Sequence, residues 1–126
     1  MFKLAVIGSR TFTDYQLLKQ ELDKFPPFIL ISGGARGADK LAEVYADCVG
    51  YEKIIFPAKW DLYGKSAGFK RNVEIINACH GVVAFWDGVS TGTKHSIDLA
   101  LKTDKKVKII HFYAKNFKSN RNGLAK

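Results

Sequence analysis

A glycine-rich segment after a short apolar run is the first place where this sequence could bind an anion. Residues 32–39 read SGGARGAD, and an apolar pattern at helical spacing follows them. Glycines let the backbone approach a ligand closely, and the first N–H groups of a helix attract phosphate. Arg36 adds a guanidinium that suits paired hydrogen bonds to phosphate oxygens. The segment predicts a phosphate cradle, and a tight strand-to-helix turn that binds nothing is the simpler alternative.

Three further segments carry side chains of the same kinds. Residues 8–11 read GSRT, residues 60–71 are rich in aromatic and basic side chains, and residues 87–93 read DGVSTGT. Together the four segments supply cations for phosphate, hydroxyls for a sugar and aromatic rings that can stack on a base. They predict a site for a nucleotide-like ligand. Its expected binding residues are Gly8, Ser9, Arg10, Ser32, Gly33, Gly34, Arg36, Gly37, Asp39, Trp60, Tyr63, Lys70, Arg71, Asn72, Ser90, Thr91, Gly92 and Thr93.

Short apolar runs alternate with helical patterns along the chain. Runs with the length of buried strands occur at residues 4–7, 28–31, 53–56, 82–86 and 106–113. Helices are expected after Asp14, over residues 38–49, from Phe69 to about Cys79, and over residues 93–102. Residues 58–68 form a longer connection, rich in aromatic residues and glycine, of the kind that carries function in α/β proteins. This alternation predicts an α/β fold, a Rossmann-like three-layer domain with a mainly parallel five-stranded sheet. In such sheets ligands bind beyond the carboxyl ends of the strands, where all four segments fall.

Length and composition indicate one globular domain. The chain has 126 residues, of which 47% are hydrophobic and 25% charged, so it can bury a core without disulfides or metals. Cys48 and Cys79 lack metal or disulfide spacing and are expected to be reduced core thiols. The sequence shows neither a signal peptide nor an apolar run that could cross a membrane, so we expect a cytoplasmic location.

The positive charge is concentrated toward the C-terminal end. The net charge is +8, and residues 102–126 hold eight basic side chains against the single acid Asp104. We therefore divide the chain into a nucleotide-binding domain, residues 1–113, and a basic tail, residues 114–126. Such a tail can contact the phosphates of nucleic acid, but a solvated surface is the more common role of a basic run.

Catalytic groups are less evident than binding groups. Asp87 follows a predicted strand and Asp98 lies in the next helix, so both are candidate acids, with Arg71 as the cation that would orient a phosphate. The three histidines have no metal-ligand spacing, and no nucleophile elbow occurs. The sequence therefore requires no cofactor, and a Mg²⁺ ion that accompanies a phosphate ligand is compatible with it.

Three motifs give the chain a family resemblance. SGGARGAD at residues 32–39 resembles the SGxARGxD loop of the DNA-processing Smf/DprA proteins, and FKRNVEII at residues 69–76 is similar to their RN-x-x-I segment. STGT at residues 90–93 resembles a phosphate loop that these proteins share with the LOG-type phosphoribohydrolases. Both groups belong to the SLOG superfamily, so the resemblance implies a Rossmann-like nucleotide-binding fold. With GSRTFTD at residues 8–14, the chain looks nearest to the small stand-alone SLOG proteins of bacteria and phages.

Two positions depart from the hydrolase pattern. The hydrolase loop ends in a glutamate that assists cleavage of the N-glycosidic bond, and the matching position here is Ser96. Asn72 stands where the hydrolases have a lysine after the arginine that matches Arg71. The resemblance therefore implies ligand binding more directly than hydrolysis.

Three functions follow, in order of preference. The first is a sensor, carrier or sequestering protein for a nucleotide or a nucleotide-derived ligand. The second is a nucleoside-monophosphate phosphoribohydrolase, in which Asp87 or Asp98 would stabilise an oxocarbenium-like sugar. The third is a single-stranded nucleic-acid binding module that uses the basic end and exposed aromatic side chains. The resemblance also implies a homo-oligomer, most simply a dimer.

Overall fold

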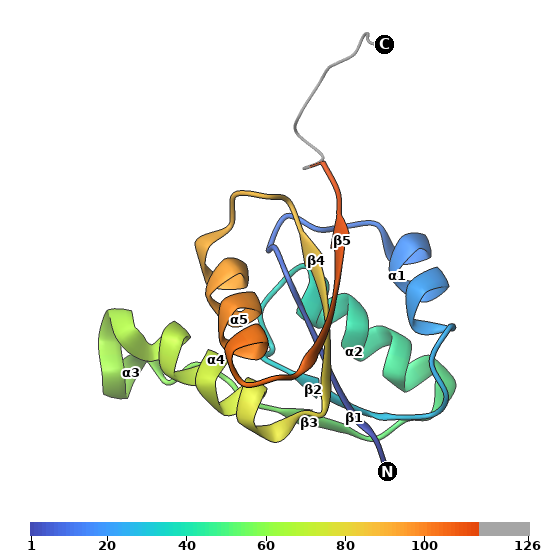
Figure 1. The fold of residues 1–126 in the computed structure, drawn as a ribbon, viewed down its shortest axis with the longest axis horizontal. Helices are drawn as coiled ribbons and strands as arrows, with labels where there is room; N and C mark the ends of the chain where they lie inside the picture. Colours follow the sequence, from blue (N-terminus) through green and yellow to red (C-terminus); the bar gives the residue numbers. More distant parts are fainter. Residues whose placement is uncertain (114–126) are drawn as a thin grey trace, which may run out of the picture.

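A five-stranded parallel sheet forms the centre of the structure, a computed structural model in which residues 1–113 are described (Figure 1). Its strands are β1 (Lys3–Gly8), β2 (Ile29–Ser32), β3 (Lys53–Ile55), β4 (Gly81–Trp86) and β5 (Lys106–His111). They lie in the order β3-β2-β1-β4-β5, and each neighbouring pair is parallel. The predicted α/β class and five-stranded sheet are confirmed, whereas the predicted basic tail, residues 114–126, lies outside the described residues.

Two pairs of helices cover the two faces of the sheet (Figure 1). One face carries α1 (Tyr15–Leu22) and α2 (Ala38–Val49), and the other carries α4 (Ala67–Ala78) and α5 (Thr91–Lys102). Successive side chains of a strand point to opposite faces. In β1, Val6 joins the core under α1 and α2, while Ile7 joins the core under α4 and α5. Because both faces are buried, the strands read as continuous apolar runs, which is why the sequence predicted them.

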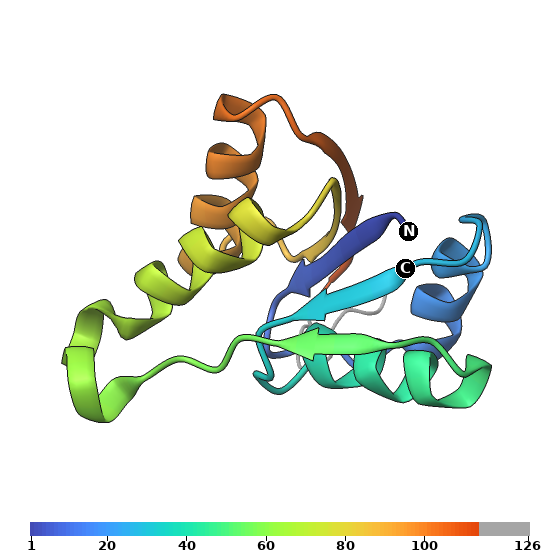
Figure 2. The ribbon, with the colours of Figure 1, turned by 90° about the horizontal axis from the view of Figure 1, so that it is seen from below.

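The long connection after β3 contains helical turns that the sequence analysis did not predict. It contains the short helix α3 (Trp60–Tyr63) and the 3-10 turn η1 (Gly64–Ser66), and α4 begins at Ala67 rather than at Phe69. Figure 2 shows α3 at the end of an arm that extends from the sheet on the side toward which the strands point. A single turn of helix is too short to establish a helical pattern of apolar residues, so the sequence analysis missed it.

Two smaller expectations are also corrected. Helix α5 begins at Thr91 rather than at Thr93. Cys48 is exposed because it lies off the buried stripe of α2, whereas Cys79 is buried, and burial raises the pKa of its thiol. Only one of the two cysteines is therefore a core residue.

The strand order reverses at β1, and the two loops beside this reversal lie against each other. The chain runs outward from β1 through β2 to β3 and then returns across the sheet to β4 and β5. As a result the loops after β1 and β4 are hydrogen-bonded together. Ser9 N–H donates to Phe85 O at 3.0 Å, and Asp87 N–H donates to Ser9 Oγ at 3.3 Å. A reversal of this kind is where open α/β sheets bind ligands.

Glycine is required where α2 approaches this edge of the sheet. A Cβ on Gly8 would lie 2.5 Å from Phe85 O and 2.6 Å from the Cβ of Ala38, the first residue of α2. Gly37, the N-cap of α2, has a φ of 83°, and a Cβ there would overlap the backbone of Ser9. The two glycines therefore let the start of α2 lie directly against the end of β1.

We expect Gly8→Ala to destabilise the fold by about 1–3 kcal/mol, because the added methyl group pushes β1, β4 and α2 apart. Urea unfolding followed by circular dichroism would measure the loss as a lower midpoint at an unchanged slope. Gly92→Ala is the matched control, since nothing lies within 4 Å of a Cβ at that position. Alanine favours a helix, so this control should be neutral or gain up to about 1 kcal/mol. Equal stability of the two variants would contradict the close packing at Gly8.

Candidate functional site

A hollow of about 410 Å³ lies at the carboxyl end of the sheet, beside the reversal of strand order. Its wall combines the loop after β1, the α3 arm, α4 and the start of α5. The polar and aromatic residues that line it are Ser9, Arg10, Thr11, Asp39, Trp60, Lys65, Phe69, Arg71, Asn72, Ser90, Thr91, Thr93 and Ser96. The volume falls within the range of small-molecule sites, about 300–1,000 Å³.

The first turn of α5 offers N–H groups that have no protein partner. Ser90 is the N-cap, and its side chain makes no capping hydrogen bond. The backbone N–H groups of Thr91, Gly92 and Thr93 have no acceptor within residues 1–113, and all three residues line the hollow. Free N–H groups at a helix N-terminus carry partial positive charge and bind anions. One end of the hollow is therefore suited to an anionic group.

The Asp87 carboxylate shapes the loop that leads into α5. Its Oδ1 accepts hydrogen bonds from Val89 N–H at 2.9 Å and Ser90 N–H at 2.8 Å, and its Oδ2 accepts one from the Ser90 hydroxyl at 3.0 Å. Burial alone would raise the pKa of Asp87, but these hydrogen bonds favour the charged form and bring the pKa below its ordinary value. Ser90 Oγ also lies 2.9 Å from Ser9 Oγ, which joins the loops after β4 and β1. Asp87 is thus a structural acceptor within the loop.

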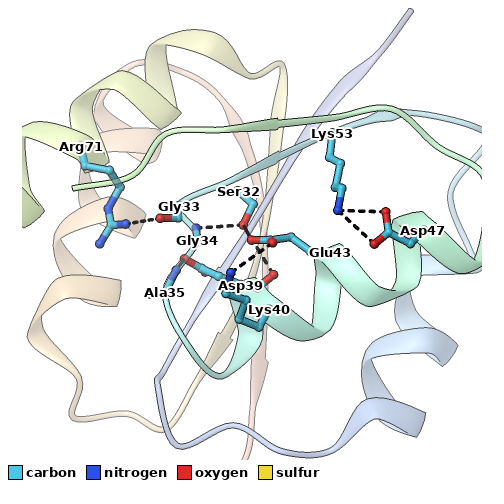
Figure 3. Close-up of polar contacts among 10 residues, drawn as sticks. All are labelled: Ser32, Gly33, Gly34, Ala35, Asp39, Lys40, Glu43, Asp47, Lys53 and Arg71. Carbon is cyan, nitrogen blue, oxygen red and sulfur yellow. Dashed lines mark hydrogen bonds and ion pairs between the residues drawn. The ribbon is translucent and has the colours of Figure 1, made fainter. Parts of the chain in front are cut away.

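The glycine-rich segment, residues 32–39, folds onto its own side chains (Figure 3). Gly34 N–H donates to Ser32 Oγ at 3.2 Å, and Ala35 N–H donates to Asp39 Oδ2 at 3.1 Å. The Ser32 hydroxyl in turn donates to Glu43 Oε2 at 2.9 Å. Within residues 32–39, only Ala35 and Asp39 line the hollow. The backbone N–H groups of Gly34 and Ala35 are therefore used by side chains of the same segment.

Asp39 is a buried carboxyl group beside the Arg71 guanidinium. The residue is 7% exposed, and burial raises the pKa of its carboxyl to about 6, with help from the charge of Glu43. The Ala35 N–H and the charge of Arg71 oppose this rise. Burial also lowers the pKa of Arg71, against the attraction of Asp39. Arg71 Nη1 donates to Gly33 O at 2.6 Å, so the guanidinium fastens α4 to the segment after β2 (Figure 3).

No basic side chain that lines the hollow forms an ion pair with a carboxylate of residues 1–113. Six lysine–carboxylate ion pairs occur among the described residues, and none of them includes a residue that lines the hollow. Arg10 and Lys65 are exposed at its wall, and Arg71 is half-buried there. Asp39 is the sole carboxyl group among the lining residues, so the hollow has an excess of positive charge.

Helices α4 and α5 are joined at the aromatic side of the hollow. Asn72 Nδ2 donates to Gly92 O at 3.3 Å and lies 3.3 Å from His95 Nδ1. The Phe69 ring packs edge-on against the His95 ring, with centroids 4.6 Å apart. Phe69 and Trp60 are each 50% exposed and both line the hollow. They leave aromatic surface available to a flat, apolar group such as a base.

The structure brings together most of the predicted residues of the loops after β1 and β4, but of the glycine-rich segment it brings only Asp39 among the predicted residues. The predicted residues that line the hollow are Gly8, Ser9, Arg10, Asp39, Trp60, Arg71, Asn72, Ser90, Thr91, Gly92 and Thr93. Those outside its lining are Ser32, Gly33, Gly34, Arg36, Gly37, Tyr63, Lys70, Asp87 and Asp98. Asp98 forms an ion pair with Lys94 at 2.8 Å, on the exposed side of α5. The two candidate acids of the hydrolase hypothesis therefore lie outside the lining.

Some residues of the site were absent from the predicted binding set. Thr11 and Lys65 lie in segments that the sequence analysis had singled out, but were not chosen there. Ser96 lies one helical turn after Thr93, and that spacing is the signal that could have placed it in the hollow. Glu43 accepts the hydrogen bond of the Ser32 hydroxyl and lies four residues after Asp39 on α2. That spacing places both acids on one face of the helix, and it could have indicated that they are buried together.

Two further findings concern metals and membranes. Among residues 1–113, no group of three or more His, Cys, Asp or Glu side chains comes together as metal ligands. No helix in this part of the chain has the length and hydropathy to cross a membrane. The cytoplasmic location, the dimer and the accompanying Mg²⁺ ion stay predictions.

The raised pKa of Asp39 should make stability fall as pH rises. The folded protein binds the Asp39 carboxyl proton more tightly than the unfolded chain does. The stabilisation from this proton is therefore complete below pH 3.8, the ordinary pKa of the carboxyl, and is lost as pH rises through about 6. We expect the stability of the natural protein, relative to Asp39→Asn, to fall by about 2–3 kcal/mol between about pH 3.5 and pH 7. Urea unfolding at a series of pH values measures this difference. Asp98→Asn, at an exposed position, is the control, and a difference for Asp39→Asn that is independent of pH would contradict the raised pKa.

Comparisons with known proteins identify relatives of this chain. The family model for YspA- and cpYpsA-related SLOG proteins, YAcAr, matches residues 2–63. The Gene 61 protein of Mycobacterium phage D29 is 33% identical over 123 residues, which cover 89% of this chain and 97% of the phage protein. The match to the phage protein therefore extends beyond the glycine-rich segment to α4 and α5.

The fold is similar to that of DNA processing protein A (DprA) from Streptococcus pneumoniae, with a TM-score of 0.71 and 20% sequence identity. The match covers 92% of this chain and 52% of DprA, so the chain spans about half of that protein. At this identity the likeness concerns the fold alone, and it confirms the predicted Rossmann-like architecture. The family and the fold fit a role related to nucleotides or nucleic acids. The chain belongs to the SLOG superfamily.

Proposed function

We propose that the hollow at the carboxyl end of the sheet binds a nucleotide or a nucleotide-derived ligand, and that the protein acts as a sensor, carrier or sequestering protein. The observation that carries this proposal is the set of unpartnered N–H groups of Thr91, Gly92 and Thr93 at the wall of a hollow with excess positive charge. A phosphate group satisfies both features at once, since it accepts several hydrogen bonds and carries negative charge.

The other walls suit the remaining parts of a nucleotide. Arg10 and Lys65 are free to neutralise phosphate oxygens, because neither has an acidic partner among the described residues. Trp60 and Phe69 offer half-exposed rings for the base. Ser9 and Asp39 also line the hollow, and a hydroxyl and a carboxyl can bind a sugar hydroxyl.

Binding without turnover is preferred to hydrolysis for a geometric reason. Asp87 already accepts hydrogen bonds from Val89 and Ser90, and Asp98 is paired with Lys94. Ser96, at the position of the hydrolase glutamate, lines the hollow with a hydroxyl, which cannot serve as the carboxylate of that mechanism. The proposal therefore assigns recognition, and no chemical step, to these residues.

A thermal-shift screen tests this function directly. We expect one class of nucleotide, among mononucleotides, ADP-ribose derivatives and cyclic dinucleotides, to raise the melting temperature by about 5–10 °C at about 100 times its Kd. The screen is run with and without Mg²⁺, and chromatography checks whether the ligand stays intact. Release of free base would favour the phosphoribohydrolase instead. No shift with any compound would contradict nucleotide binding at this site.

Removal of a single backbone donor tests where the phosphate binds. Thr91 is the first residue of α5, a position at which proline is tolerated, and Ser90 has a φ of −62° and a ψ of 118°, which suit a residue before proline. We expect Thr91→Pro to keep the stability of the fold within about 1 kcal/mol and to weaken nucleotide binding about tenfold, because a hydrogen bond to a charged group is lost. Calorimetric titration measures the affinity.

Thr91→Ala is the matched control for this experiment. It removes the same side chain and keeps the N–H group, so its affinity should stay close to that of the natural protein. Equal weakening by both substitutions would place the effect in the side chain and would contradict the backbone site.

A further inference from the structure

A second, smaller hollow of about 190 Å³ lies beside α3 and α4. Its lining includes three cations, Lys59, Lys70 and Arg71, and one acid, Glu74. Arg71 lines both hollows, so the two hollows adjoin each other at this side chain. The function proposed above does not use Lys59 or Lys70.

Two adjacent faces of helix α4 line the two hollows. Ala67, Lys70, Arg71 and Glu74 line the second hollow, and their spacing places them on one face of the helix. Gly68, Asn72 and Ile75 line the first hollow and lie on the adjacent face. Arg71 stands at the border of the two faces. One guanidinium N–H is used by Gly33 O, and its other N–H groups are left for ligands on either side.

The cations of the second hollow are not neutralised by the protein. Neither Lys59 nor Lys70 forms an ion pair with an acid within residues 1–113. Glu74 follows Lys70 by one helical turn, yet Lys70 Nζ lies over the Tyr63 ring instead, 4.9 Å from its centroid. A ring face holds a cation without removing its charge. The second hollow therefore keeps an excess of positive charge that an anion would relieve.

We infer that the second hollow binds a second phosphate of the same ligand, so that the ligand of this protein carries two phosphate groups separated by a ribose. This inference rests on the proposed function, which places the first phosphate at α5. A nucleoside 3′,5′-bisphosphate and a 5′-phosphorylated dinucleotide both carry two phosphates with a ribose between them, whereas the phosphates of a nucleoside diphosphate are adjacent. Arg71 lines both hollows.

Calorimetric titration with four probes of the same base tests the inference: a nucleoside monophosphate, its diphosphate, its 3′,5′-bisphosphate and the 5′-phosphorylated dinucleotide. The full-length protein is used, and the series is repeated for each common base. We expect the bisphosphate or the dinucleotide to bind at least about tenfold more tightly than the monophosphate, while the diphosphate gains less than about threefold. The probe that shows the higher affinity, the bisphosphate or the dinucleotide, identifies the kind of ligand that supplies the second phosphate.

The double variant Lys59→Gln/Lys70→Gln supplies the second arm, since glutamine keeps most of each side chain and removes its charge. It should abolish the tenfold gain and leave monophosphate affinity within about twofold. Lys102→Gln/Lys106→Gln removes the same charge from exposed positions away from both hollows and should change neither affinity.

The outcomes separate the two proposals. Monophosphate binding with no gain for either longer probe, or an equal loss for all probes in Lys59→Gln/Lys70→Gln, would overturn the second phosphate site and leave the proposed function in place. No binding of any probe would overturn the proposed function and this inference with it.

Discussion

The arrangement of the site depends on the hydrogen bond from Arg71 Nη1 to Gly33 O, which connects helix α4 to the segment after β2. Helix α4 follows the α3 arm, and its buried contacts with the sheet come from its second half, at Ile75 and Ile76. The first half carries most of the α4 residues that line the two hollows. At 2.6 Å, the contact with Gly33 fixes this half against the end of β2. A Cβ on Gly33 would lie 2.6 Å from Arg71 Nη1, so glycine is what allows the guanidinium to enter.

Asp39 acts as an internal anion in the segment that looked most like a phosphate cradle. Its carboxyl group accepts the Ala35 N–H and lies beside Arg71, which are the kinds of partner a bound phosphate would take. The chain supplies its own acceptor there, whereas the N–H groups of Thr91, Gly92 and Thr93 at the start of α5 have no acceptor within residues 1–113. The same glycine-rich sequence can therefore serve as a scaffold for Arg71 rather than as the ligand loop itself. Arg36, the cation of that segment, stays exposed and outside the lining of the hollow.

The sequence predicted the fold better than it predicted the site, for a physical reason. Apolar runs and helical spacing record burial, and burial decides which residues form the sheet and its covering helices. Whether an N–H group is free depends on which side chain reaches it. Ser32 satisfies Gly34, and Asp39 satisfies Ala35, whereas no side chain caps α5 at Ser90. The motifs at residues 32–39 and 90–93 look equally suitable as sequences, and only the contacts distinguish them.

The ion pairs of the described residues involve no residue that lines either hollow. Six lysines pair with carboxylates elsewhere, and Glu21 contacts both Lys24 and Lys108. At the hollows Lys65 and Lys70 form no ion pair with an acid of residues 1–113, and the carboxyl group beside Arg71 is one whose pKa is raised to about 6. Unpaired cations and uncapped N–H groups each lower the stability of the empty protein. The proposed ligand would supply the missing partners, since an anion bound in the hollow could pair with these cations and accept from these N–H groups, and its binding would stabilise the fold by mass action.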